Sequence, residues 1–146
     1  MNYSYRQASP TDKKVIFDIY RLVMREFIEE IWGWNEEWQR DDFNKHFVPE
    51  NVNVVYFDSN LIGYSQVDVQ SNHKHLRMLV IHPAYQRNGI GSKLLYLFIS
   101  SQKDMATKLS LDVFKINTIA KEFYEKSGFT VERETSTSYV MNFQNW

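Results

Sequence analysis

Two glycines, Gly89 and Gly91, lie one residue apart between an apolar segment and a run of residues with helical spacing. The first free amides of a helix, together with the helix dipole, form a site for an anion, and glycine lets a ligand approach the backbone closely. Arg87 adds a charged donor two residues before Gly89. These residue types in this order indicate a turn that binds a phosphate or pyrophosphate group.

Two other phosphate motifs fit this turn badly. A P-loop requires Gly-Lys-Ser/Thr, whereas Ser92 precedes Lys93 here. The dinucleotide fingerprint G-x-G-x-x-G requires a third glycine at the position that Leu94 occupies. A tight turn that uses its glycines for shape alone remains the alternative for this motif taken by itself.

The composition excludes several other kinds of site. The chain has no cysteines, which removes disulfides, thiol nucleophiles and thiolate metal ligands. Its four histidines form no H-E-x-x-H pair; His73 and His75 could share a strand face, but no third ligand is evident, so we expect no metal. A net charge of −1 gives no reason to expect a nucleic-acid partner.

The sequence also gives no sign of a membrane partner. No apolar run reaches spanning length, and the first ten residues lack the cationic start and apolar core of a signal peptide. We therefore expect a cytoplasmic protein. A length of 146 residues suits one domain, 1–146, with a real hydrophobic core.

The spacing of apolar residues predicts both helices and strands. The expected helices are 9–33, 36–47, 91–102 and 118–126, and the expected strands are 3–7, 52–58, 61–70, 73–81, 108–115, 129–133 and 138–143. Strands dominate the middle of the chain, and one crossover helix lies on each side of strand 108–115. This order predicts an α/β fold with a mixed sheet rather than a series of βαβ units.

The glycine turn resembles the Q/R-x-x-G-x-G/A signature of the GNAT acyltransferases, with QRNGIG at residues 86–91. A second segment agrees, since Asn117 and then FYEKSGF at residues 123–129 resemble the family's late N-x(6)-Y-x-x-x-G-F segment. The order of the predicted elements matches that fold from about residue 3 to the end. The chain is therefore identified as similar to the GNAT N-acetyltransferases.

The resemblance implies a central, mostly antiparallel mixed sheet flanked by four helices, in which two parallel strands splay apart around acetyl-coenzyme A. Here these strands would be 73–81 and 108–115. The first would pair with the pantetheine arm, an amide near Val80 would polarise the thioester carbonyl, and the amides of the glycine turn would hold the pyrophosphate. The implied cofactor contacts are Leu79, Val80, Ile81, Arg87, Asn88, Gly89, Ile90, Gly91, Ser92 and Asn117.

The resemblance implies a catalytic role for Tyr124. This residue matches the tyrosine that protonates the departing thiolate in many members of the family, and a phenol is a suitable acid for that step. The alternative is that Tyr124 only packs beside Phe123.

The second candidate catalytic residue is His75. Some relatives carry a glutamate base at about this place, and an imidazole titrates in the useful range. The alternative is a solvated histidine at a strand end, and Asp68 is a further candidate base. Alternation along the strand predicts one face that carries His75, Arg77, Leu79 and Ile81.

The charge is divided unevenly along the chain. Residues 26–42 hold seven acids against one arginine, a net charge of −6, together with three tryptophans, whereas residues 73–108 have a net charge of +5. The basic part would carry the polyanionic cofactor, and the acidic, aromatic part would suit a cationic amine through charge attraction and cation–π contact. The alternative is a solvated acidic helix face with the tryptophans in the core. The candidate substrate contacts are Glu29, Glu30, Trp32 and Trp34.

These patterns and the resemblance predict an enzyme that moves an acetyl group from acetyl-coenzyme A to a primary amine, with a small cationic amine favoured. A peptide or protein amine is the alternative acceptor, and a GNAT-like sensor that binds acyl-coenzyme A without turnover is a further alternative. A nucleotide-phosphate binder is disfavoured by the missing motifs. Many relatives are dimers, so the resemblance suggests a homodimer, although no segment specifies an interface.

Overall fold

The computed structural model describes residues 2–101 and 107–143, which form helices and strands in the predicted order. The helices are α1 (Lys13–Ile31), α2 (Glu36–His46), α3 (Ile90–Ser100) and α4 (Thr118–Lys126), with short 3-10 turns at Pro10–Asp12, Pro49–Asn51 and Pro83–Tyr85. The strands are β1 (Tyr3–Gln7), β2 (Val52–Phe57), β3 (Asn60–Gln70), β4 (His73–Ile81), β5 (Lys108–Phe114), β6 (Phe129–Glu134) and β7 (Ser138–Phe143).

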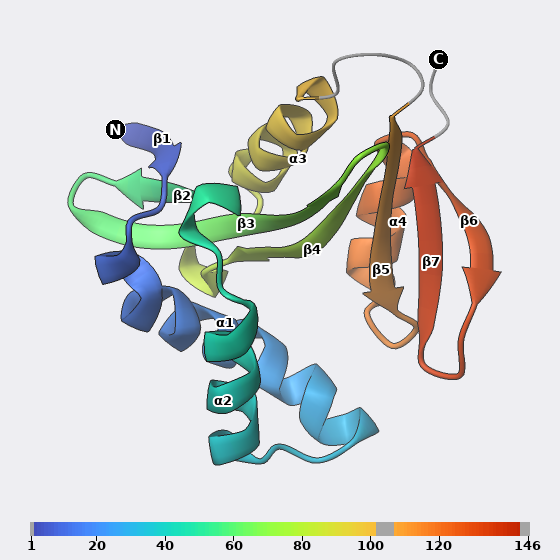
Figure 1. Ribbon diagram of the computed structural model, residues 1–146, viewed down its shortest axis with the longest axis horizontal. Helices are drawn as coiled ribbons and strands as arrows, with labels where there is room; N and C mark the ends of the chain where they lie inside the picture. The colour runs from blue at the N-terminus through green and yellow to red at the C-terminus, as the bar shows by residue number, and fades with distance from the viewer. Residues whose placement is uncertain (1, 102–106, 144–146) are drawn as a thin grey trace.

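The strands form one seven-stranded sheet in the order β1-β2-β3-β4-β5-β7-β6. Every neighbouring pair is antiparallel except β4 and β5, which are parallel. Figure 1 shows β1–β4 as one group and β5, β7 and β6 as a second group turned away from it. The mixed, mostly antiparallel sheet with four flanking helices confirms the predicted fold class.

The two parallel strands separate after a short paired segment. β4 and β5 are in register only from His73 and Lys108 to Leu76 and Leu111. The pairing of β3 with β4 shifts between Gln66 and Val67, which leaves Arg77 as an extra residue in β4. A β-bulge bends its strand and increases the local twist, and here it lies where β4 leaves β5. The predicted splayed pair is thus present, and the bulge accounts for it.

The bulge also corrects one prediction about β4. Arg77 and Met78 face the side of α1, where they line a small pocket with Tyr20, whereas Leu79 and Ile81 pack on the side of α3. The prediction that His75 and Arg77 share a face with these two residues is wrong, because an inserted residue reverses the alternation beyond it. Nothing in the order of side-chain types marks a bulge in advance.

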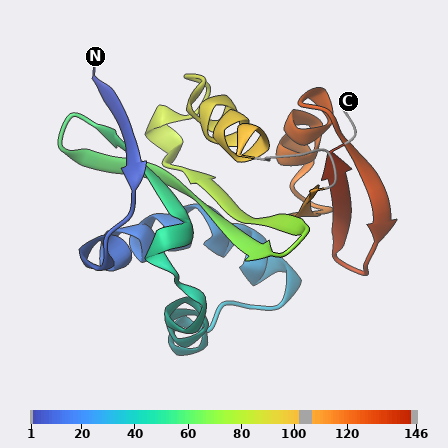
Figure 2. The ribbon, with the colours of Figure 1, turned by 45° about the horizontal axis from the view of Figure 1, so that its top comes forward.

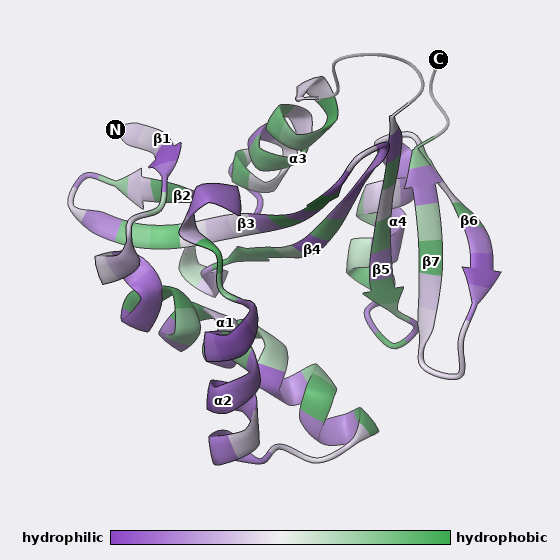
Figure 3. Ribbon diagram, viewed as in Figure 1, coloured by the Kyte–Doolittle hydropathy of each residue, from purple (hydrophilic) through white to green (hydrophobic). Residues whose placement is uncertain are grey.

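Helices cover both faces of the first group of strands. α1 and α2 lie on one side of β3 and β4, and α3 lies on the other (Figures 1 and 2). Ile16 and Ile19 of α1 pack on Val54 and Val80, which explains the apolar stripe of that helix. Figure 3 shows that α2, by contrast, is hydrophilic over most of its length, and the only buried residue of α2 is Gln39.

The second group of strands has its core on one face. α4 lies behind β5 and β7 in Figure 1, and the cluster between these elements includes Leu109, Leu111, Tyr124 and Met141. Burying a side chain of this size contributes about 1.5–3 kcal/mol, so this cluster holds α4 firmly against the sheet.

α3 buries one face against the sheet. Its buried residues are Ile90, Leu94, Leu95 and Phe98. The expected end of this helix at Gln102 lies outside the described residues, as do Lys103 and Asp104 of the basic segment.

The ends of α1 and α4 have the local backbone of helix termini. Gly33 has a left-handed φ of 84° just after α1, and Gly128 has a φ of 106° after α4. Asn117 caps α4, since its side-chain oxygen accepts a hydrogen bond of 3.2 Å from the Ala120 amide. These local signals fix where α4 begins, and α4 carries one of the predicted catalytic residues.

A buried carboxylate joins β1, β2 and the start of α1. Asp12 accepts hydrogen bonds from Arg6 at 3.0 Å, from the Ser9 amide at 2.8 Å and from the Tyr56 hydroxyl at 2.9 Å. Burial would raise the pKa of Asp12, but these hydrogen bonds outweigh it and lower the pKa to about 2. This cluster stabilises the N-terminal corner, and none of its members lines the cleft described below.

Candidate functional site

A cleft of about 310 Å³ opens where β4 and β5 part. Side chains and backbone from several elements line it, so the cleft exists only in the folded chain. The lining residues are Met24, Trp32, Leu76, Arg77, Met78, Leu79, Asp112, Val113, Phe114, Asn117, Ala120, Tyr124 and Ser138. Four of the residues singled out from the sequence therefore meet in one place: Trp32, Leu79, Asn117 and Tyr124.

Tyr124 reaches the cleft from the buried face of α4. Its ring packs against Phe123 and Phe129 at centroid distances of 5.3 and 6.1 Å, and only 8% of the residue is exposed. Burial raises the pKa of the phenol well above its ordinary value of 10. The hydroxyl therefore keeps its proton at neutral pH, as a general acid must before it donates.

The side-chain amide of Asn117 already accepts one hydrogen bond within the protein. The side-chain oxygen caps α4, and the residue lines the cleft. Within the described residues, its amide nitrogen forms no hydrogen bond and could donate to a ligand. Capping thus places this donor at a fixed position beside the cleft.

The glycine turn joins the end of β4 to α3. Gly89 is the residue before the first helical position and has a φ of 78°, and Arg87 is left-handed at 70°. Left-handed residues in succession with ordinary ones direct amides to the same side, as in anion-binding turns. The Gln86 side chain donates to the Ile81 carbonyl at 3.0 Å and anchors the turn to the strand.

The N-terminus of α3 is free to receive an anion. No side chain caps this helix, so its first amides have no protein acceptor. A Cβ added at Gly89 would meet nothing within 4 Å, and Arg87 is exposed with no ion pair among the described residues. These features fit a polyphosphate group.

The two glycines of the motif have different structural roles. Gly89 needs its left-handed backbone, whereas a Cβ on Gly91 would meet only Phe123 at 3.7 Å, an ordinary contact. The Gly/Ala tolerance of the motif's last position follows from this difference. Of the remaining cofactor candidates, Asn88 and Ser92 are exposed at the turn.

Three other cofactor candidates could contact a ligand through the backbone. The side chains of Val80 and Ile90 are buried in the core, and Ile81 packs partly against the cluster that holds Ile90. Beyond Leu76, β4 has no register partner in β5, so its edge toward β5 is open. A ligand in the cleft would therefore meet strand backbone there, together with the side chain of Leu79.

His75 lies outside the lining of the cleft, in the paired part of β4. Its Nδ1 is 2.7 Å from the Ser110 hydroxyl, and its Nε2 is 3.5 Å from a carboxylate oxygen of Asp112. Asp112, rather than His75, lines the cleft. Asp68, the further candidate base, forms an ion pair with Arg77 at 3.1 Å.

The two tryptophans predicted to contact substrate are in different environments. Trp32 lines the cleft with 64% of its surface exposed and packs edge-on against Phe114 at 5.7 Å. Trp34 lies against Tyr20 at 6.1 Å and donates to Glu36 at 2.9 Å, away from the cleft. One tryptophan is thus available to a ligand, and the other supports the α1–α2 connection.

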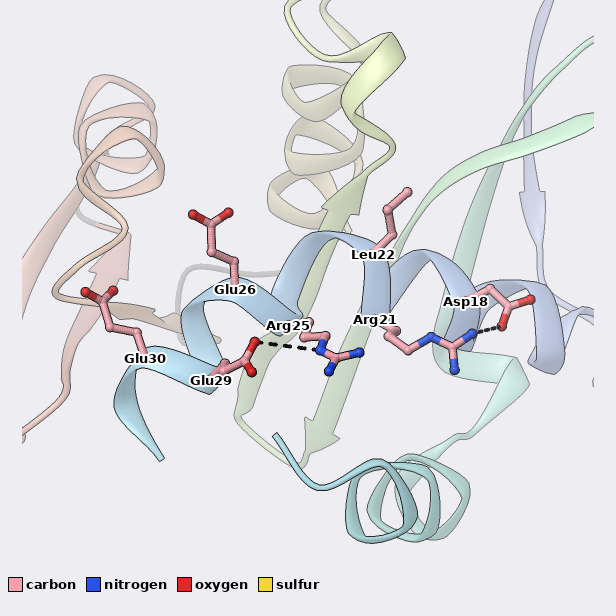
Figure 4. A pocket seen from close by; sticks show the side chains of 7 residues that line it. All are labelled: Asp18, Arg21, Leu22, Arg25, Glu26, Glu29 and Glu30. Atoms are coloured by element: carbon pink, nitrogen blue, oxygen red, sulfur yellow. Dashed lines mark hydrogen bonds and ion pairs between the residues drawn. The ribbon is translucent and has the colours of Figure 1, made fainter. Parts of the chain in front are cut away.

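Glu29 and Glu30 lie along a shallow groove on the outer face of α1 (Figure 4). Glu29 pairs with Arg25 at 3.7 Å, whereas Glu26 and Glu30 point away from the arginines in Figure 4. This groove is larger than the cleft, but α1 alone supplies its walls. It holds neither the phenol nor the glycine turn, so its size does not make it the reactive site.

Sequence reasoning missed Asp112, Arg77 and Phe114 as cleft residues. A signal for Asp112 was present, because alternation along 108–115 places it with Ser110 and Phe114 on the polar side of the strand. No comparable signal existed for Arg77, since the bulge decides which way it faces. Among the described residues, no group of three acidic or histidine side chains could hold a metal ion, and no helix is long and apolar enough to cross a membrane.

Comparisons with known proteins agree with this geometry. A spermidine N(1)-acetyltransferase from Thermoplasma acidophilum is 25% identical over 166 aligned positions, which cover 97% of this chain and 96% of the relative. The crystal structure of a PaiA N-acetyltransferase from the same organism, in complex with coenzyme A, superposes with a TM-score of 0.82 at 22% identity and covers 99% of this chain and 100% of that one.

A third relative shows how widely this fold is used. The ribosomal-protein-S18-alanine N-acetyltransferase from Escherichia coli superposes with a TM-score of 0.72 at 18% identity, covering 97% of this chain and 93% of that one. Residues 16–129 match the acetyltransferase (GNAT) family, a range that includes the glycine turn, Asn117 and Tyr124. The chain belongs to the GNAT acetyltransferase family and is an acyltransferase of the N-acetyltransferase type.

Proposed function

We propose that the cleft binds acetyl-coenzyme A and that the chain transfers the acetyl group to a small primary amine carrying further positive charge. The observation that carries this proposal is the meeting of an open strand edge, Asn117 and a buried phenol at one cleft, with the glycine turn following the end of the same strand. When bound, acetyl-coenzyme A supplies an activated acetyl thioester.

The glycine turn would hold the pyrophosphate of the cofactor. Free amides at the start of α3 and the unpaired Arg87 supply donors and positive charge within the described part of the chain. The edge of β4 near Val80 would pair with the pantetheine arm and donate an amide to the thioester carbonyl. Asn117 would add its free amide nitrogen.

Tyr124 would act as the acid. Its phenol lines the cleft, and burial raises its pKa, so the hydroxyl is protonated when a thiolate leaves. The aromatic shell of Phe123 and Phe129 keeps the ring in one orientation. The donated proton would go to sulfur, and the phenol would then regain a proton from the acceptor side.

Two cleft residues support a cationic acceptor. Trp32 offers an exposed aromatic face, and Asp112 offers a carboxylate that is more than half exposed. The relative named for spermidine acetylation supports the same class of acceptor. Glu26, Glu29 and Glu30 on the outer face of α1 would attract cations over a longer range rather than contact the reacting amine.

The test is steady-state turnover with acetyl-coenzyme A and four acceptors: spermidine, putrescine, butylamine and a short peptide with an N-terminal alanine. We expect kcat/KM for spermidine to exceed that for butylamine at least about tenfold, as expected for one additional charged contact. A preference for the peptide would overturn the small-amine proposal and favour the alternative of a peptide N-acetyltransferase.

A binding measurement distinguishes the enzyme hypothesis from the alternative of a non-catalytic acyl-coenzyme A sensor. Calorimetric titration with desulfo-coenzyme A, alone and with each amine, reports cofactor and acceptor binding without turnover. A higher affinity for desulfo-coenzyme A in the presence of a polyamine supports the proposal. Tight cofactor binding without turnover of any acceptor would favour the acyl-coenzyme A sensor.

Three further expectations stay predictions. A single domain over 1–146 is consistent with one continuous sheet, and limited proteolysis would test it. A homodimer would be tested by light scattering, and a cytoplasmic location by fractionation of cells.

A further inference from the structure

A second, smaller cavity adjoins the cleft on the side of α1 and α2. It has a volume of about 60 Å³, and Arg77 and Met78 line both this cavity and the cleft. A volume of this size corresponds to roughly two water molecules, which is also the size of an ammonium group with the methylene beside it. We call this cavity the α2 pocket, and its polar lining residues are Tyr20, Asp42, His46, Tyr64, Gln66 and Arg77.

Two polar side chains of β3 in the α2 pocket have atoms that need a partner. Tyr64 and Gln66 are only 1% and 4% exposed. Within the described part of the chain, the Tyr64 hydroxyl forms no hydrogen bond. The Gln66 Nε2 donates to the His46 carbonyl at 2.7 Å, which leaves the Gln66 Oε1 without a donor among the same residues. Because buried polar atoms are normally hydrogen-bonded, these two oxygens indicate that the pocket receives a polar group.

The charged groups around the α2 pocket leave it negative. Asp42 and Asp68 carry negative charge against the positive charge of Arg77, and Arg77 is already paired with Asp68 at 3.1 Å. His46 Nδ1 lies 3.0 Å from the Asp42 carbonyl oxygen and 3.3 Å from its carboxylate. A neutral imidazole with its proton on Nδ1 makes this contact, so the charge of the Asp42 carboxylate is not cancelled.

The two phenols of the α2 pocket add oxygen acceptors but no charge. Burial and then the charge of Asp42 raise the pKa of Tyr20 to about 12, although Arg77 opposes them. Burial and then Tyr20 raise the pKa of Tyr64 above its ordinary value, again against Arg77. The Tyr20 hydroxyl donates its proton to Gln39 at 2.9 Å, so toward the pocket its oxygen can only accept.

We propose that the α2 pocket binds a second ammonium group of the acceptor while the first amine reaches the cleft. A primary ammonium has three donors and no acceptor, which matches the Asp42 carboxylate, the Gln66 amide oxygen and the Tyr64 oxygen. The proposal rests on the acetyl transfer proposed above and names the residues that select a diamine or polyamine over a monoamine. It also gives the acidic segment 26–42 one carboxylate, that of Asp42, in a cavity beside the cleft.

The first test varies the charge at the far end of the acceptor. Putrescine, butylamine and 4-aminobutyrate have similar chain lengths and end in a cation, a methyl group and an anion. We expect KM to be lowest for putrescine and highest for 4-aminobutyrate, with about tenfold between putrescine and butylamine, as for one charged hydrogen bond. Equal KM values, or a lower KM for 4-aminobutyrate than for putrescine, would overturn the proposal.

The second test is Asp42→Asn, which removes the charge and keeps the shape of the side chain. We expect the ratio of KM for butylamine to KM for spermidine to fall about tenfold. Asp41→Asn is the matched control, because Asp41 is the preceding residue of α2, is exposed, and lines neither the α2 pocket nor the cleft. It removes the same charge from the same helix and should keep the wild-type ratio. Equal falls in both variants would show long-range attraction alone and overturn the pocket.

The third test is Tyr64→Phe, which removes one oxygen from the α2 pocket. Because this hydroxyl has no partner within the described residues, the free energy of unfolding measured with urea should not fall. We expect the same KM ratio to fall about threefold, as for one hydrogen bond to a neutral group. Tyr96→Phe on the exposed side of α3 is the control. A wild-type ratio in Tyr64→Phe would contradict binding of the ammonium in this pocket.

Calorimetry distinguishes failure of this proposal from failure of the proposed acetyl transfer. Spermidine is titrated into the wild-type protein and into Asp42→Asn, each saturated with desulfo-coenzyme A, and we expect a Kd about tenfold higher in the variant. If this difference is found but no amine is acetylated, the proposed function fails and the pocket stands. If spermidine is acetylated with the same KM and Kd in both proteins, the transfer reaction stands and the pocket is overturned.

Discussion

The two ends of the β4–β5 strand pair differ in strand pairing and in the groups that they expose. At the closed end, His73–Leu76 and Lys108–Leu111 are in register, and Leu76 and Leu111 are buried in the core that α3 and α4 share. At the open end, Arg77–Ile81 has no partner in β5, and the space between the strands is the cleft. One extra residue, Arg77, separates the end that holds the sheet together from the end that offers backbone and side chains to a ligand.

The difference also separates two kinds of polar group. At the closed end, Ser110, His73 and His75 satisfy one another's hydrogen bonds. At the open end, the Tyr124 phenol, the Asn117 amide nitrogen and the start of α3 have free hydrogen-bonding capacity within the described residues. Groups with free hydrogen-bonding capacity can bind a ligand, which is why we propose that the open end is the binding end.

The largest effect is expected from Gly89→Asp at the open end. An aspartate would place negative charge beside the expected pyrophosphate and strain a backbone with φ of 78°. Repulsion of about 1–4 kcal/mol per close charge pair near a protein surface predicts at least about 100-fold weaker binding of acetyl-coenzyme A, measured by calorimetry.

Gly33→Asp is the matched control for this change. Gly33 has a nearly equal φ of 84° and equally open space where a Cβ would stand, but it follows α1 instead of preceding α3. Both variants should lose similar stability, and only Gly89→Asp should lose cofactor affinity. Equal affinities in the two variants would contradict a phosphate site at the turn.

Tyr124→Phe should lower turnover about 100-fold, the lower range for removal of a general acid, and leave cofactor affinity unchanged. Tyr96→Phe, on the exposed side of α3, is the control. Because burial raises the pKa of Tyr124 above 10, the phenol stays protonated through moderately alkaline pH. Wild-type activity should therefore show no loss at a pH of about 9 from this group, and full activity of Tyr124→Phe would remove its acid role.

Asp12→Asn tests whether cofactor affinity at the cleft depends on the free energy of unfolding that Asp12 contributes at the N-terminal corner. The folded pKa of Asp12 is lowered from 3.8 to about 2, so its stabilisation is complete at pH values above the unfolded pKa and is lost as pH falls toward the folded one. The shift corresponds to about 2 kcal/mol at neutral pH.

Urea unfolding of wild type and Asp12→Asn at neutral pH and at a pH of about 2.5 measures this term. The difference in unfolding free energy should be near its full value at neutral pH and smaller in acid, with cofactor affinity unchanged at neutral pH. A difference that is the same at both pH values would show that the Asp12 charge is not what stabilises the corner.

The smallest effect is expected from Trp32→Ala, which should raise the KM for spermidine about threefold, as for one cation–π contact of about 0.5–1 kcal/mol at an exposed site. Trp38→Ala on α2 is the control, because Trp38 is similarly exposed, at 60% against 64%, and does not line the cleft. Equal KM values for the two variants would exclude Trp32 from acceptor binding.

Local sequence was sufficient for most of the fold. β4 and α4 have the predicted bounds, because alternation, capping and a glycine stop each act within a few residues of their own position. The same holds for the glycine turn, where Gly89 reports its own left-handed backbone. Asn117 and Tyr124, which belong to one sequence motif, both line the cleft.

Side-chain surroundings were the part that the sequence left open. Trp32 and Trp34 both flank Gly33, and the sequence does not distinguish them. In the structure, Trp32 lines the cleft and Trp34 packs on Tyr20. Glu29 and Glu30 belong to an acidic run, but the rotation of α1 places them on its outer face. A helix angle or a partner from a distant element decides each of these cases.

By itself, the sequence determined the element order, the position of the glycine turn and the family, because propensity, capping and glycine backbones are local properties. Only the tertiary structure decided that Arg77 bulges, that Asp112 rather than His75 meets the cleft, and that Ser110 links two histidines. These outcomes depend on the pairing register of β3, β4 and β5, which is a relation between segments far apart in the chain and is not written in any one of them.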